Sequence, residues 1–181
     1  MKDNTRINIQ TIVEQAKTAD ADAFGKLYDI FLDTIYRFVS FRVSTREDTE
    51  DLTEQIFLHA FTHIRGYEER GIPFEAWLYR IARNKIIDHY RTKHITIPIH
   101  DREDLVDERK SPEEITEQSM DFELVRSKMR LLPETYREII SLKYIEDKEN
   151  TEISEILGKP VDQIRVLQGR AIQKLKQLLH I

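Results

Sequence analysis

The sequence contains no cysteine and few of the residues that break helices. Of its 181 residues, five are glycine and five are proline. The absence of cysteine excludes a disulfide scaffold, a thiol nucleophile and a thiolate zinc site, and it is compatible with a cytoplasmic protein. The scarcity of glycine and proline favours helices over a turn-rich β fold. We therefore expect an all-α protein.

Long apolar runs are also missing. No stretch approaches the ~20 apolar residues that span a bilayer, and the first ten residues, MKDNTRINIQ, lack the apolar core of a signal peptide. We expect a cytoplasmic protein that does not insert into a membrane. The net charge of −5 argues against indiscriminate coating of nucleic acid, but it permits DNA binding by local basic surfaces.

The clearest pattern lies in residues 132–179. Apolar residues recur there at a helical period, and a polar break follows in which Asn150 or Thr151 suits the N-cap of a short helix. Gly158 suits a left-handed C-cap, and Pro160 suits the start of the next helix. Two helices joined by so short a turn predict a helix-turn-helix unit.

The second helix of this unit carries a polar face that suits DNA. Four basic residues and one acid lie between Pro160 and Ile181, opposite an apolar stripe. Arginine pairs with guanine, glutamine pairs with adenine, and an exposed valine can contact the thymine methyl group. A solvated basic face without a ligand is the alternative interpretation. The candidate DNA-binding residues are Gln163, Arg165, Val166, Gly169, Arg170 and Lys174.

Residues 1–93 predict a helical domain of their own. We expect a short helix over residues 7–18, a second helix from Asp20 or Asp22 to about Val43, and a third that ends near Ile64, with Phe57 and Phe61 beside its core positions. The third helix has an acidic outer face. Such a face is usually only solvated, but it can also dock a basic partner surface.

A further helix, predicted from Phe74 to about Thr92, carries a second basic surface. Residues 79–93 contain five basic residues and one acidic residue. Tyr79 and Tyr90 lie on the same helix and could stack on an unpaired base, although core packing is the favoured interpretation. The candidate residues of this surface are Arg80, Arg83, Asn84, Lys85 and Arg91.

Residues 94–111 are predicted to be an acidic linker, because they contain a proline and show no helical period. Ser111 and Pro112 then suit a helix start that opens a second helical domain, residues 112–181. The predicted architecture is two small helical domains joined by this linker. Since each domain has a basic helix, we expect two contacts on one nucleic acid.

Signs of an enzyme are weak. His59 and His63 have metal-ligand spacing on a helix, but the glutamate of the HExxH motif is missing. No phosphate-binding glycine loop is present, and no carboxylate lies beside a recognisable nucleophile. We expect no catalytic activity, no metal and no cofactor.

Three stretches together resemble bacterial RNA polymerase sigma factors of the extracytoplasmic-function (ECF) type. TEDLTEQIF (49–57) resembles the segment that docks on the polymerase clamp, and PFEAWLYRIARNKIIDHYRTK (73–93) resembles the segment that reads and opens the downstream promoter element. LPETYREIISLKYIEDKENTEISEILGKPV resembles the reader of the upstream element. The combination of Trp77, Ala82-Arg83-Asn84 and Asp88 is the most specific part.

The resemblance implies core RNA polymerase and promoter DNA as partners, with an anti-sigma factor as a further partner. It implies a region 2-like domain over residues 1–93, a linker over 94–111 and a region 4-like domain over 112–181. The loop 65–72 would hold a flipped base. The implied polymerase-binding residues are Asp51, Glu54 and Gln55.

The recognition helix departs from the family's pattern at four positions. Leu167 and Ile172 stand where the family usually has arginine, Gln168 falls on the apolar side where leucine is usual, and Gly169 lies in mid-helix. The resemblance therefore implies an upstream contact of altered strength or specificity. Two alternatives remain open: a helix-turn-helix regulator that is not a polymerase subunit, and an interaction protein that mimics or sequesters a sigma factor.

Overall fold

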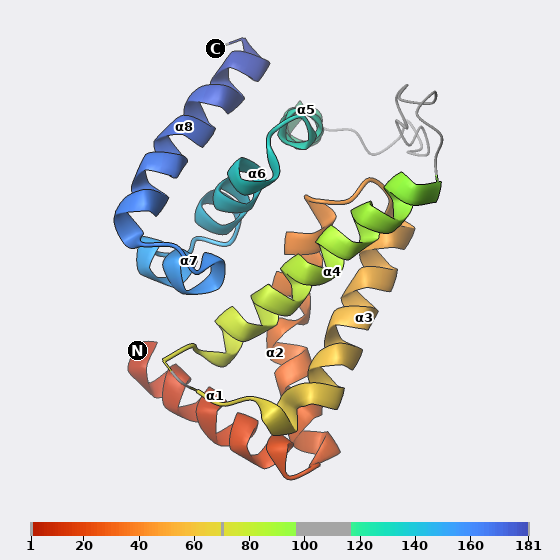
Figure 1. Ribbon diagram of the computed structural model, residues 1–181, viewed down its shortest axis with the longest axis vertical. Coiled ribbons are helices and arrows are strands. Elements are labelled where there is room, and N and C mark those ends of the chain that lie inside the picture. The colour runs from red at the N-terminus through yellow and green to blue at the C-terminus, as the bar shows by residue number, and fades with distance from the viewer. Residues whose placement is uncertain (1, 70, 97–116, 181) are drawn as a thin grey trace.

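The computed structural model describes residues 2–69, 71–96 and 117–180, and every regular element within them is helical (Figure 1). The all-α prediction is therefore confirmed. Most of the predicted linker and the predicted helix start at Ser111 and Pro112 lie outside the described residues. Among the helices that the structure describes, none is long and apolar enough to cross a bilayer.

The first domain contains four α-helices and one 3-10 turn. Its elements are α1 (Lys2–Lys17), α2 (Ala21–Ser40), α3 (Arg46–His63), η1 (Ile64–Gly66) and α4 (Phe74–Thr96). Asp20 and Thr45 cap α2 and α3, because their side-chain oxygens accept backbone N–H bonds of 3.0 Å from Ala23 and Asp48. Three predicted ends were inaccurate: α1 begins at Lys2, α2 ends at Ser40 and α4 extends to Thr96.

The second domain is the predicted helix-turn-helix unit with two preceding helices. Its elements are α5 (Glu117–Arg130), α6 (Glu134–Ile140), the π-helical segment η3 (Ser141–Ile145), α7 (Asn150–Leu157) and α8 (Val161–Leu179). Gly158 adopts φ +64° as the left-handed C-cap of α7, as predicted. The predicted cap at Asn150 or Thr151 was wrong. Glu149 occupies the N-cap position, and its backbone N–H donates to Glu152 Oε2 at 2.7 Å.

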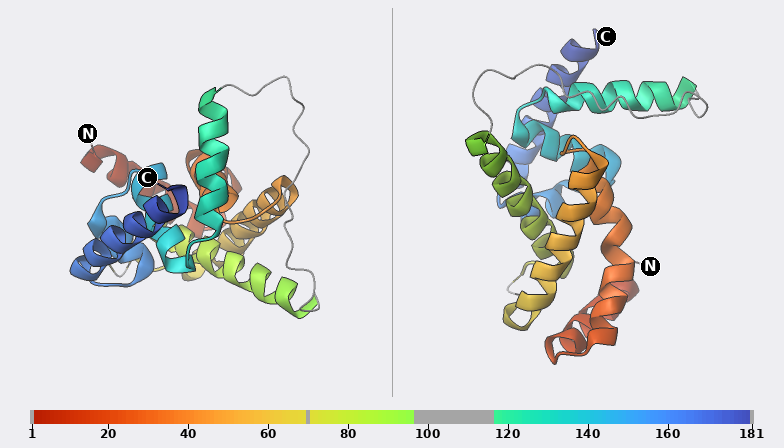
Figure 2. Two further views of the ribbon diagram at one scale, coloured as in Figure 1. Left: turned by 90° about the horizontal axis from the view of Figure 1, so that it is seen from above. Right: turned by 90° about the vertical axis from the view of Figure 1, so that its right-hand side faces the viewer.

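The two domains pack against each other, which the sequence did not indicate. In Figures 1 and 2 the second domain lies beside the first, and α7 contacts α4 directly. One apolar cluster runs from Ile35 and Ile86 of the first domain to Ile139 and Ile153 of the second. Phe41, which follows α2, lies instead in the apolar cluster of the second domain. The seam between the domains is therefore partly apolar.

Candidate nucleic-acid and polymerase interfaces

The predicted recognition face of α8 is exposed along its whole length. All six candidate residues are exposed to solvent, while Ile164, Ala171 and Leu175 on the opposite side are buried against the domain core. Val166 keeps 52% of its surface accessible. The candidate residues are Gln163, Arg165, Val166, Gly169, Arg170 and Lys174.

The basic surface on α4 is only partly open. Asn84 and Arg91 are exposed and Lys85 is half-buried. Arg80 and Arg83 are held by the second domain: Arg80 Nη2 donates to the Glu155 carbonyl oxygen at 2.6 Å, and Arg83 Nε donates to Glu138 Oε1 at 2.6 Å. The structure thus divides the predicted basic surface into an exposed part and a part that is bound to the second domain.

Neither tyrosine of α4 is available to stack on a base. Tyr79 is completely buried, and burial raises the pKa of its hydroxyl well above the usual range. Tyr90 is half-buried, and its hydroxyl donates to the carbonyl oxygen of Arg42. The favoured interpretation, core packing, is correct for both.

The loop between α3 and α4 is anchored by Tyr67, which is 5% exposed. The Tyr67 hydroxyl donates to the Ile72 carbonyl oxygen at 2.7 Å, and its ring packs on Trp77 with centroids 5.1 Å apart. Burial raises the pKa of Tyr67 to about 12. Arg65 and Glu68, on either side of the anchored Tyr67, are exposed. Their side chains can therefore reach a ligand while Tyr67 holds the backbone in place.

Asp51, Glu54 and Gln55 are exposed together on α3. Beside them, α2 and α3 form an open, mostly apolar groove of about 620 Å³, whose lining includes Leu58 and Phe61. Leu58 is 59% exposed and Phe61 is 46% exposed. The Phe61 ring still packs beside the core, as predicted, because it meets the buried Phe24 ring edge-on with centroids 5.0 Å apart. The exposed apolar side of this groove was predictable from the sequence, because Glu54, Leu58 and Phe61 share one helical face.

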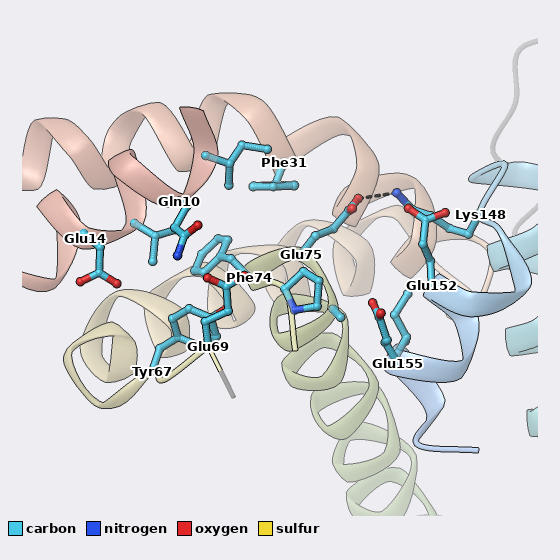
Figure 3. Close-up of a pocket in the computed structure, with 15 residues that line it drawn as sticks. Gln10, Glu14, Phe31, Tyr67, Glu69, Phe74, Glu75, Lys148, Glu152 and Glu155 are labelled. Atoms are coloured by element: carbon cyan, nitrogen blue, oxygen red, sulfur yellow. Dashed lines mark hydrogen bonds and ion pairs between the residues drawn. The ribbon is translucent and has the colours of Figure 1, made fainter. Parts of the chain in front are cut away.

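A smaller cavity of about 230 Å³ lies between the domains, where α1 and the start of α4 meet α7 (Figure 3). Its floor is apolar, with Val13, Phe74 and Ile156, and several glutamates surround it. Figure 3 shows the Glu75 carboxylate paired with the Lys148 ammonium group at one side of this cavity.

The two histidines with metal-ligand spacing pack on each other. His59 and His63 stack with centroids 4.0 Å apart, and within the described part of the chain no group of three histidine or acidic side chains is placed to hold a metal ion. Burial lowers the pKa of His59, and nearby His63 and Lys85 lower it further.

A buried charge cluster joins the domains, and no pattern in the sequence predicted it. Arg42, which is fully buried, pairs with Glu134 and with Glu138, and the Glu138 carboxylate also accepts from Arg83. Burial lowers the pKa of Arg42 to about 10. We call Arg42, Arg83, Glu134 and Glu138 the interdomain charge cluster.

Comparison with known proteins matches both domains to one family. The sequence model of Sigma-70 region 2 matches residues 27–96, and that of Sigma-70 region 4 matches residues 122–175. The ECF RNA polymerase sigma factor BldN of Streptomyces coelicolor is 32% identical over 179 residues, which cover 98% of this chain and 68% of BldN. SigW of Bacillus subtilis is 30% identical, with 94% and 96% covered.

Solved structures share the fold. CnrH, in complex with the cytosolic domain of CnrY, has a TM-score of 0.72 at 24% identity, covering 94% of this chain and 96% of CnrH. RpoE of Bartonella quintana, in complex with the anti-sigma factor NepR, has a TM-score of 0.71 at 22% identity, covering 87% and 97%. With both regions matched in order along one chain, and relatives similar over nearly its full length, this protein belongs to the family of ECF RNA polymerase sigma factors.

Proposed function

We propose that this sigma factor binds core RNA polymerase through α3, reads the upstream promoter element with α8, and contacts and opens the downstream element with α4. The functional units are residues 1–93 and 112–181, joined by the linker 94–111. The protein performs no covalent chemistry itself and acts in the cytoplasm with the polymerase.

The exposed face of α8 is the observation that carries the proposal. Its six candidate residues project to solvent from a helix that follows a tight glycine turn, so the helix can enter a major groove while its apolar side stays in the core. Among the residues that the structure describes, the Arg165 side chain pairs with Asp162 of its own helix, at 3.0 Å with both side chains exposed. Such an exposed pair is readily exchanged for a base or phosphate.

The surface of α3 supports polymerase docking. Asp51 and Glu54 supply negative charge, and the groove with Leu58 and Phe61 beside them supplies exposed apolar area. An apolar patch with a charged rim has the composition of a protein interface.

A protein inhibitor is a further proposed partner. CnrH is seen in complex with the cytosolic domain of CnrY, and RpoE in complex with the anti-sigma factor NepR. Both proteins share the fold of this chain, so we propose that an anti-sigma factor binds it as well.

Promoter-dependent transcription by the purified protein with bacterial core polymerase, on a library of genomic fragments, tests the proposal. New start sites that share two spaced elements are expected. Arg165→Ala and Arg170→Ala should each weaken binding to the upstream element by ~1–3 kcal/mol, the usual worth of one base contact. Lys176→Ala is the matched control, because Lys176 is exposed on the same helix outside the candidate set.

A separate variant tests the proposed docking on polymerase. Asp51→Lys should weaken the affinity for core polymerase and leave upstream DNA binding unchanged, whereas Asp29→Lys on the exposed side of α2 should change neither. Equal polymerase affinity in both variants would contradict the docking assignment. Sequence-specific DNA binding without any polymerase binding would instead favour a helix-turn-helix regulator.

A further inference from the structure

Gly169 is an exposed glycine in the middle of the helix α8, and nothing within the chain requires it. Glycine destabilises a helix relative to alanine, because it loses more backbone freedom on folding. A left-handed backbone can require glycine, but positive φ is found at Gly71 and Gly158 and not at Gly169. Close packing can require it too. Among the described residues, however, an added Cβ would meet no atom within 4 Å apart from its own helix backbone.

The residues around Gly169 form a narrow apolar strip between two arginines. At about 100° per residue, the order around the helix is Arg165, Gly169, Val166 and Arg170, and all four are exposed. Val166 lies three residues before Gly169 on the same face, and more than half of its surface is accessible. The Val166 side chain therefore stands beside a notch, which Gly169 leaves open on the surface of α8.

A notch of this composition suits one group of the major groove. Thymine presents a methyl group there, whereas the other three bases present only hydrogen-bond donors and acceptors. A methyl group that enters the notch would bury apolar area against Val166, and a Cβ at position 169 would occupy the same space. The flanking Arg165 and Arg170 can donate to guanine or to phosphate oxygens, which holds the helix close to the base edges.

We propose that Gly169 and Val166 form a receptor for the methyl group of one thymine in the upstream element, and that the missing Cβ of Gly169 makes room for it. This inference rests on the proposed role of α8 and adds the base that this part of the helix reads. Gly169 is then a specificity-determining residue, and its cost to the stability of the helix is offset by a closer approach to DNA.

Removal of the methyl group from the DNA is the first half of the test. The probe is a fluorescent promoter duplex from a start site mapped with the parent protein, bound by the holoenzyme at a fixed salt concentration. Each thymine of the upstream element is replaced in turn by deoxyuridine, which pairs in the same way but lacks the methyl group. At one thymine this change should weaken binding by the parent about fourfold, the worth of one buried methyl group.

Addition of a methyl group to the protein is the second half. Gly169→Ala should bind the thymine duplex about tenfold more weakly than the parent does, because its Cβ overlaps the thymine methyl group. On the duplex with deoxyuridine at the responsive position, Gly169→Ala should bind within about twofold of the parent, and a double-mutant cycle measures this coupling. The melting temperature of Gly169→Ala should not fall, which separates a lost contact from a damaged helix.

Gly25→Ala is the matched control. Gly25 is also exposed within a helix, α2, and an added Cβ would find the same open space there. This variant should leave the response to every deoxyuridine unchanged. Val166→Ala is a second test variant, because it removes the side chain that the methyl group contacts. With Val166→Ala, deoxyuridine at the responsive position should weaken binding less than it does with the parent.

Several results would overturn the proposal. One is equal binding of the thymine duplex by Gly169→Ala and the parent, and another is a parent protein that responds to no deoxyuridine. A loss of the same size on thymine and deoxyuridine duplexes, or a loss confined to assembly with core polymerase, would place the reason for Gly169 elsewhere. In each case, start sites mapped with the parent leave the proposed function standing. The absence of start sites would remove the proposed function, and this inference with it.

Discussion

Phe41 offers a direct test of the packing of the two domains against each other, which we call the closed arrangement. It belongs to the first domain by sequence, but its ring is 3% exposed and lies in the apolar cluster of the second domain, with Met129, Leu132 and Ile140. If the domains were separate in solution, this ring would lie in water. Phe41→Ala therefore measures the docking of the domains rather than the stability of either one.

The size of the effect follows from the buried area. A phenylalanine buries roughly 200 Å², which at about 25 cal/mol per Å² amounts to roughly 5 kcal/mol. The unfolded chain already covers part of that area, so we expect Phe41→Ala to lower the free energy of unfolding by about 3–4 kcal/mol. Phe61→Ala is the matched control. Since Phe61 is 46% exposed, its truncation should cost about half as much or less.

Urea unfolding provides the assay, with two probes. The only tryptophan, Trp77, lies in the first domain and reports its unfolding, whereas far-ultraviolet circular dichroism reports helices of both domains. The transitions should coincide in the parent protein and separate in Phe41→Ala, because the docking that couples the domains is lost. A cost for Phe41→Ala no greater than that for Phe61→Ala would refute the closed arrangement.

Two further predictions concern local structure. Gly158→Ala should lower the stability by about 1 kcal/mol, because φ is +64° there. Gly169→Ala should raise the stability by about 0.5–1 kcal/mol, since Gly169 is helical and an added Cβ would meet open space. Thermal denaturation of both variants checks these opposite signs, and equal signs would contradict the assigned backbone. His63→Gln should raise the pKa of His59 toward the ordinary value of about 6.5, because it removes a stacked neighbour whose charge opposes protonation. Nuclear magnetic resonance titration measures this shift, and an unchanged pKa would leave burial and Lys85 as its causes.

Local patterns in the sequence were sufficient for the helices and for much of the candidate site. Apolar residues at helical spacing predicted the recognition helix, and the same spacing placed Arg165 and Arg170 on its outer face, where the structure has them exposed. Gly158 was predictable because few other residues adopt a left-handed C-cap without strain. Helix ends were less accurate: Glu149 rather than Asn150 occupies the cap of α7, because a glutamate three residues further on accepts its backbone N–H.

Only the tertiary structure decided how the two domains meet, and with that the state of the α4 surface. Arg37 and Glu146 are 109 residues apart, and Arg83 and Glu138 are 55 apart, so no helical period within either domain records their pairing. The sequence by itself determined the family, the helices and the charged faces, because those depend on neighbours within one or two turns. The Arg83–Glu138 bond forms only because the domains dock, and the free energy of docking is a sum over the whole seam.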